Sequence, residues 1–181
     1  LEARDHYEEL ASCDQLCWLA GLGLSGIGAA GAEAVIGSLS GSSLAELDLS
    51  GNALEGDPVL AELGWQLPRL ERLSLADNGL AGSDALEALG ERLLDRLRSF
   101  DLSGNRGLGA EALGYLADRT PRLERLALDR IPYLVGAIDA LAFRSPSLRT
   151  IHADRSVTRD ERRYLRETHP RIEFRFGERP G

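Results

Sequence analysis

The chain contains 181 residues, 43% of them hydrophobic, which is enough for a continuous core and too many for a disordered chain. Its formal net charge of −8 disfavours nucleic-acid binding, which needs basic residues against phosphate, and is compatible with a basic protein partner. No apolar run approaches the ~18 residues that cross a membrane, and no secretory signal opens the chain. We therefore expect no membrane partner and a cytoplasmic or intracellular location, either as a resident protein or as a translocated effector.

The residue usage gives two further expectations. The chain begins at Leu1 and contains no Met, so we expect a processed product, an excised domain or part of a larger protein. All 21 basic residues are Arg, and Ala, Gly and Leu are also abundant. This composition is typical of a GC-rich genome and indicates a bacterial source.

Residues 1–16 are expected to form an N-terminal cap, because their apolar residues fall at helix-like spacing. Cys13 and Cys17 lie in and just after this segment, with His6 nearby. A zinc site needs four ligands, and the rest of the set is missing, so we expect no metal. We interpret both cysteines as small buried hydrophobes, and we expect Trp18 to be buried as a cap residue.

An apolar pattern recurs from residue 44 to residue 153, at steps of 26, 27, 26 and 25 residues. Within each copy, alternating apolar residues predict a strand, and a stretch at helical spacing predicts a helix. The clearest helical stripe is Leu86, Leu89 and Leu93. The copies are Leu44-Ala-Glu-Leu47-Asp-Leu49-Ser-Gly-Asn52-Ala-Leu54, Leu70-Glu-Arg-Leu73-Ser-Leu75-Ala-Asp-Asn78-Gly-Leu80, Leu97-Arg-Ser-Phe100-Asp-Leu102-Ser-Gly-Asn105, Leu123-Glu-Arg-Leu126-Ala-Leu128 and Leu148-Arg-Thr-Ile151-His-Ala153.

This L-x-x-L-x-L-x-x-N-x-L pattern resembles the leucine-rich-repeat superfamily. The repeat length is similar to the ribonuclease-inhibitor-like class, and Ile27-Gly28-Ala-Ala-Gly31-Ala32 and the looser Leu108-Gly109-Ala-Glu-Ala-Leu113 resemble the bacterial GALA type. The resemblance implies an α/β solenoid of about six or seven repeats, shaped as a horseshoe arc. Strands ~4.8 Å apart that face helices ~8–10 Å apart must curve, which places a parallel sheet on the concave face and helices on the convex face.

We assign residues 1–181 to a single leucine-rich-repeat domain. The cap occupies residues 1–16, the repeats residues 17–156, and a C-terminal helix, closing strand and frayed tail residues 157–181. Thr158-Arg-Asp-Glu161 predicts a capping box at the start of that helix.

The first repeat is compatible with two registers. One starts at Cys17 and turns Ala20 and Leu22 inward. The other starts at Leu19 and turns Leu22 and Leu24 inward, and the sequence does not decide between them.

Asn52, Asn78 and Asn105 fall at the same position of successive repeats. We interpret them as a ladder of side-chain amides that satisfies backbone groups in the turns, rather than as an interaction site. The equivalent residues Ile131 and Ser156 break the ladder, so the later turns are expected to differ.

The residues that point outward from the strands should form the concave face. Ser, His and Asp all occur there, which raises the question of hydrolysis. However, Ser103 lies two strands from His152, about 10 Å away, whereas a nucleophile and its base need about 3 Å. We therefore expect no catalytic site, no cofactor and no enzyme activity. The outward residues are Glu46, Asp48, Ser50, Arg72, Ser74, Ala76, Ser99, Asp101, Ser103, Arg125, Ala127, Asp129, Thr150, His152 and Asp154.

Arg72 and Arg125 have carboxylates on adjacent strands, so cross-strand neutralisation and a mixed-charge strip for a partner are both open. The concave face leans acidic, and a concave acidic surface steers a basic partner. We expect a basic protein segment to lie around Asp101 and Asp129. The predicted partner-binding residues are Asp48, Arg72, Ser74, Asp101, Arg125, Asp129, His152 and Asp154.

The sequence thus predicts a non-catalytic protein–protein interaction module, or scaffold, with its site on the concave face. Two alternatives stay open. The ribonuclease-inhibitor-like class includes a nuclease inhibitor and a GTPase activator, so the resemblance implies a regulator of a nuclease or GTPase. The chain could instead be a structural arm of a larger multidomain protein.

Overall fold

The computed structural model describes residues 7–56, 58–131 and 135–177. The start of the predicted cap and the end of the predicted tail lie outside these residues. The described strands form one open sheet, in which each strand pairs in parallel with the next in chain order. The strands are β1 (Gly21–Gly23), β2 (Glu46–Asp48), β3 (Arg72–Ser74), β4 (Ser99–Asp101), β5 (Arg125–Leu128), β6 (Thr150–Ala153) and β7 (Glu173–Phe176).

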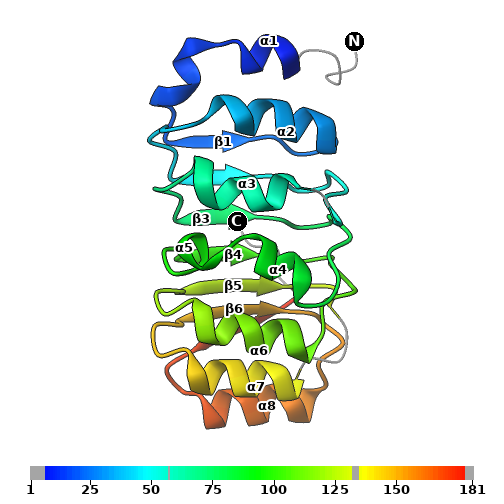
Figure 1. The fold of residues 1–181 in the computed structure, drawn as a ribbon. Helices are drawn as coiled ribbons and strands as arrows, with labels where there is room; N and C mark the ends of the chain where they lie inside the picture. The colour runs from blue at the N-terminus through cyan, green and yellow to red at the C-terminus, as the bar shows by residue number, and fades with distance from the viewer. Residues whose placement is uncertain (1–6, 57, 132–134, 178–181) are drawn as a thin grey trace.

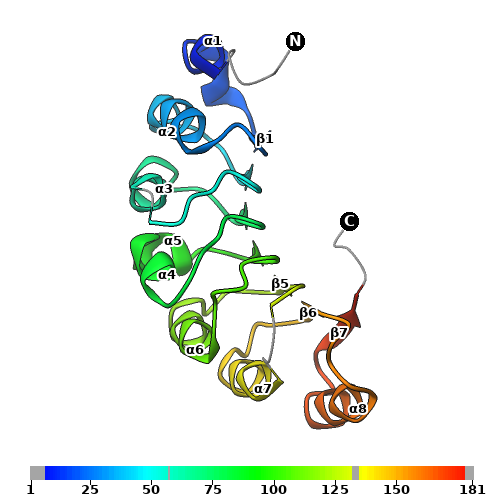
Figure 2. The same cartoon turned by 90° about the vertical axis from the view of Figure 1, so that its right-hand side faces the viewer.

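The helices line the other side of the sheet, and the two layers form an arc with the strands inside (Figures 1 and 2). The predicted α/β solenoid, with a concave parallel sheet and convex helices, is therefore confirmed. The helical elements are α1 (Tyr7–Ala11), the 3-10 helix η1 (Asp14–Trp18), α2 (Ala29–Ser38), α3 (Val59–Gln66), α4 (Asp84–Ala88), α5 (Glu91–Leu94), α6 (Ala110–Arg119), α7 (Val135–Arg144) and α8 (Arg159–Thr168).

The repeated leucines build the core between the two layers. Leu47, Leu73 and Leu126 are each at most 3% exposed and stack in register from strand to strand. A single repeat cannot bury such residues by itself, so each unit depends on its neighbours for its core. None of the described helices is long and apolar enough to span a bilayer.

Two helices replace the single helix that Leu86, Leu89 and Leu93 suggested. All three leucines are buried as expected, but α4 ends before Gly90 and α5 begins after it. Gly90 has a φ of +74°, a left-handed conformation that interrupts a right-handed helix. The three leucines remain on one buried face because both short helices pack against the same side of the sheet.

The first repeat follows the register that starts at Leu19. Leu22 pairs with Leu47, and Gly21 pairs with Glu46, so Leu19 and not Cys17 corresponds to the first leucine of the later repeats. The predicted capping box at the other end of the chain is confirmed, because Thr158 and Glu161 cap the start of α8 reciprocally.

Burial of the N-terminal cysteines and Trp18 was wrongly predicted. Cys13 and Cys17 are both exposed, and Trp18 is 84% exposed. The register explains Cys17, which precedes the first repeat instead of occupying its first apolar position. In η1 it is Leu16 that reaches the core.

Candidate protein-binding surface on the concave face

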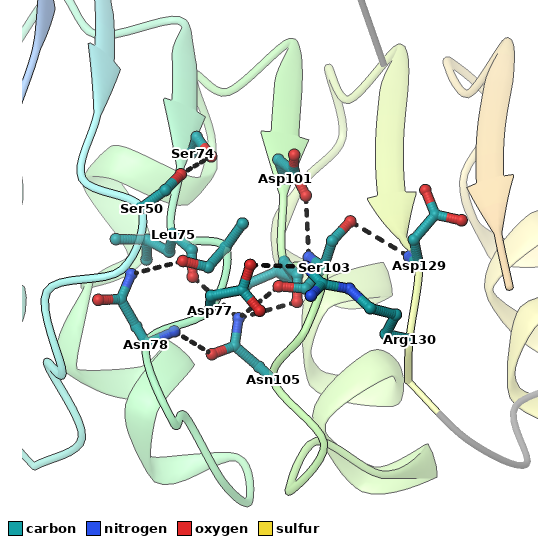
Figure 3. Close-up of polar contacts among 12 residues, drawn as sticks. Ser50, Ser74, Leu75, Asp77, Asn78, Asp101, Ser103, Asn105, Asp129 and Arg130 are labelled. Atoms are coloured by element: carbon teal, nitrogen blue, oxygen red, sulfur yellow. Dashed lines mark hydrogen bonds and ion pairs between the residues drawn. The ribbon is translucent and has the colours of Figure 1, made fainter. Parts of the chain in front are cut away.

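The predicted asparagine ladder is present at the carboxyl ends of the strands (Figure 3). Asn78 donates through Nδ2 to the carbonyl oxygens of Leu49, at 2.9 Å, and Ala76, at 3.2 Å. Its Oδ1 accepts the backbone N–H of Asn52 at 2.8 Å, and the Oδ1 of Asn105 accepts that of Asn78 at 3.0 Å. The amides are buried, so they satisfy backbone groups that water does not reach.

The later turns differ from the earlier ones, as the break in the ladder predicted, and they use a carboxylate, which was not predicted. Ile131 is buried and has no polar side-chain atom, and Ser156 is exposed. Asp154 accepts the backbone N–H of Ser156 through Oδ1 at 2.7 Å and that of Arg130 through Oδ2 at 2.9 Å. These hydrogen bonds favour the ionised form, and the bond from the Ser156 backbone is the main reason that the pKa of Asp154 is lowered.

An ion pair spans two repeats at the same edge of the sheet. Arg130 donates through its guanidinium to Asp77 Oδ2 at 2.5 Å, and Gly104 lies between them in the intervening repeat. A Cβ at Gly104 would lie 2.0 Å from Asp77 Oδ1, so only glycine leaves room for this pair. The pair thus joins the turn after β3 to the turn after β5.

A groove of about 730 Å³ opens on the concave face beside this ion pair. It gathers five carboxylates and two guanidinium groups from successive repeats, so its charge is predominantly negative. The backbone N–H of Ser50 and of Ser103 orient two of the carboxylates, those of Asp48 and Asp101, at 2.9 and 2.8 Å. The charged residues of the lining are Asp48, Asp77, Asp101, Asp129, Asp154, Arg130 and Arg155.

Asp129 is the carboxylate of this groove that has a buried oxygen atom, Oδ2, without a hydrogen-bond donor among the described residues. Burial raises the pKa of Asp129, and the neighbouring carboxylates of Asp101 and Asp154 raise it further, whereas His152 lowers it. A cationic donor in the groove would therefore bind Asp129 favourably.

The groove collects half of the predicted partner-binding residues, namely Asp48, Asp101, Asp129 and Asp154. Arg72 lies outside it and pairs with Glu46 on the adjacent strand at 2.8 Å, so it is neutralised across strands. Ser74 is half-buried and shares a 2.8 Å hydrogen bond with Ser50.

Arg125 and His152 line a separate, smaller hollow of about 400 Å³, which also includes Asp101. Arg125 is exposed, but His152 is only 6% exposed, contrary to its prediction as a surface residue for a partner. Its register neighbours are Ala127 and Arg175, at the point where β5 to β7 turn away from the line of the earlier strands (Figure 2). Strand alternation predicts the face of a side chain and not the burial that this curvature adds.

Three charged residues of the groove were missing from the predicted site, namely Asp77, Arg130 and Arg155. Arg130 and Arg155 each directly follow an aspartate of the lining, and Arg130 has a φ of +61° at the turn position that Gly51, Asp77 and Gly104 occupy in the earlier repeats. Asp77, Arg130 and Arg155 thus fall at the same position of their repeats, and this recurrence of a charged residue at the turn is the sequence signal that would have identified them. No cluster of three or more potential metal ligands occurs within the described part of the chain.

Comparisons with known proteins support the fold. No family model matches the chain, and no curated protein matches its sequence. The leucine-rich repeat-containing protein LegL7 from Legionella pneumophila has a similar structure, with a TM-score of 0.62 and 18% identity over 95% of this chain. The chain spans 60% of the length of LegL7.

A CutC protein from Streptococcus agalactiae also matches, with 13% identity over 93% of this chain and 92% of that one. Its TM-score of 0.39 is too low to establish a shared fold. The chain therefore has a leucine-rich-repeat-like solenoid fold, while the ribonuclease-inhibitor-like and GALA types remain predictions.

Proposed function

We propose that the chain is a non-catalytic protein-interaction module that binds a basic segment of a partner protein in the acidic groove. The observation that carries this proposal is the set of four aspartates in the lining without an ion pair to any described residue. Carboxylates brought together in this way repel one another, and a cationic partner relieves that repulsion. The four residues are Asp48, Asp101, Asp129 and Asp154.

Asp129 gives the groove a specific point of recognition. Its buried Oδ2 has no donor among the described residues, so a guanidinium or ammonium group of a partner supplies the missing hydrogen bond. The concave shape focuses the negative potential and speeds the approach of a basic segment.

The separation of the candidate nucleophile and base supports a non-catalytic role. The Ser103 hydroxyl already accepts the Asp129 backbone N–H at 3.2 Å, and His152 is buried two strands away. The two alternative functions differ in how they use the groove. A regulator of a nuclease or GTPase would bind through it, whereas a structural arm would leave it unused.

Titration with a basic model peptide of alternating Arg and Ser tests the proposal by fluorescence anisotropy. Changing both Asp101 and Asp129 to Arg is expected to weaken binding severalfold or more, mainly by slowing association, and added salt should do the same. The matched control changes Glu87 and Glu111 to Arg, because both are exposed carboxylates on the convex helices. Equal binding to both double variants, or indifference to salt, would contradict the proposal.

A further inference from the structure

The first strand differs from the others on its concave face. Gly21 and Gly23 occupy both of its outward positions, where they are exposed. The equivalent positions of β2 to β7 carry side chains in every case, such as Glu46 and Asp48 on β2. The sheet therefore begins with a strip of bare backbone next to the acidic part of the concave face.

Nothing in the described part of the fold requires glycine at these two positions. Neither residue has a left-handed φ, and a Cβ on Gly23 would meet no atom within 4 Å. A Cβ on Gly21 would make an ordinary 3.6 Å contact with Glu46 Cβ. Glycine within a strand weakens it and often marks a place where a ligand or another backbone approaches closely.

Two exposed apolar residues lie just before this strand in the chain. Trp18 is 84% exposed and Leu19 is 36% exposed. The Ala20 carbonyl accepts the backbone N–H groups of Ala45 and Glu46, so this segment continues the line of β1 along the sheet. Tryptophan is enriched among the residues that dominate binding energy at protein interfaces.

We propose that the partner segment carries a large apolar residue that packs on the β1 glycines against Trp18 and Leu19. This inference rests on the proposed function, because the basic residues of the same segment occupy the acidic groove. From β1 to β4 and β5 the sheet spans about 14 to 19 Å, which an extended chain covers in about four to six residues. The partner segment thus carries a large apolar residue, and its basic residues follow or precede that residue by about four to six positions.

This inference is tested on the whole chain by selecting binders from a library of random peptides. Each peptide is about twelve residues long, which is enough to make both contacts. Peptides that bind the wild type are expected to combine a large apolar residue with basic residues at the stated separation. Gly23→Leu should reduce their affinity about tenfold or more, because the new side chain fills the place of the apolar residue. In a Trp65→Phe background, Trp18 is the remaining tryptophan, and its fluorescence should shift on binding.

Gly37→Leu is the matched control, because Gly37 lies in the same repeat on α2, is exposed and has no atom within 4 Å of its built Cβ. It should leave binding unchanged. Thermal unfolding should show that neither leucine variant is less stable than the wild type. A loss of stability on Gly23→Leu would overturn the argument that the fold leaves this position free.

The outcomes separate this inference from the proposed function. If the selected peptides bind Gly23→Leu normally but lose binding when Asp101 and Asp129 are changed to Arg, the groove is used and the β1 contact is wrong. If they lose binding to Gly23→Leu alone, the acidic groove is not used, and both the proposed function and the two-point partner are wrong. A selection that yields no binding peptide overturns the inference as well.

Discussion

The turns after β2, β3 and β4 and the turn after β6 meet the same backbone requirement with different chemical groups. In the early turns, Asn52, Asn78 and Asn105 both donate and accept, so each amide links its repeat to the one before it. In the late turn, the Asp154 carboxylate can only accept, and it holds two N–H groups without continuing the chain of amides. The ladder ends after β4, whereas the groove draws carboxylates from repeats on both sides of that point. The amides therefore stabilise the regular turns, and Asp154 both satisfies the late turn and lines the groove.

The largest effect should be common to both regions, because the core does not change between them. Leu73→Ala in β3 and Leu126→Ala in β5 should each lower the free energy of unfolding by about 2 to 5 kcal/mol, since each removes a buried side chain and leaves a cavity. Urea denaturation measures both. A marked difference between the two variants would mean that the irregular region packs less tightly than its burial indicates.

A smaller effect should separate the two regions. Asn78→Ala should lower the free energy of unfolding by about 1 to 3 kcal/mol, because it leaves buried backbone groups of its own and the neighbouring repeat without partners. Ser156→Ala, at the equivalent late position, is exposed and should change stability by less than about 0.5 kcal/mol. Chemical denaturation of both variants tests the comparison, and a neutral Asn78→Ala would show that the ladder is not a stabilising element.

The smallest effect concerns pH and should appear in the late turn alone. The pKa of Asp154 is lowered below its ordinary value of 3.8, so its contribution is complete above that value and is lost as the pH falls through the lowered pKa. Asp154→Asn should therefore unfold at a lower temperature than the wild type at pH 7, and the difference should shrink below about pH 3.8. Asn78→Ala is the control, because the difference that it makes involves no titrating side chain. A pH-independent difference for Asp154→Asn would contradict the role of its charge.

The parts of the fold that depend on short-range periodicity were predictable from the sequence. Alternation at Leu47 and Leu49 identified a strand and its buried face, and the recurrence of Asn78 identified the ladder. The break at Gly90 was not predicted, because glycine at that position is also compatible with a continuous helix until its φ is known.

The candidate site was predicted in part, for a similar reason. Asp101 and Asp129 follow from strand alternation, but the burial of His152 depends on the curvature of the sheet around β5 to β7. The contact between Arg130 and Asp77 joins two repeats that are not adjacent and passes over Gly104 in the repeat between them. It depends on the three-dimensional path of the turns, so the repeat pattern of the sequence does not predict it. The place of Cys17 and Trp18 before the first repeat depends on a register that the sequence had left open between a start at Cys17 and a start at Leu19.

The asparagine ladder also protects the chain from chemical ageing. Asn78 precedes Gly79, and in such a pair the backbone nitrogen of the glycine can attack the side-chain amide, which converts asparagine to an acidic residue. In the folded chain, Asn78 cannot turn toward that nitrogen without breaking its hydrogen bonds to Leu49, Ala76 and Asn52. Deamidation at this position therefore requires a local opening of the repeat, and its rate reports how often the solenoid opens there.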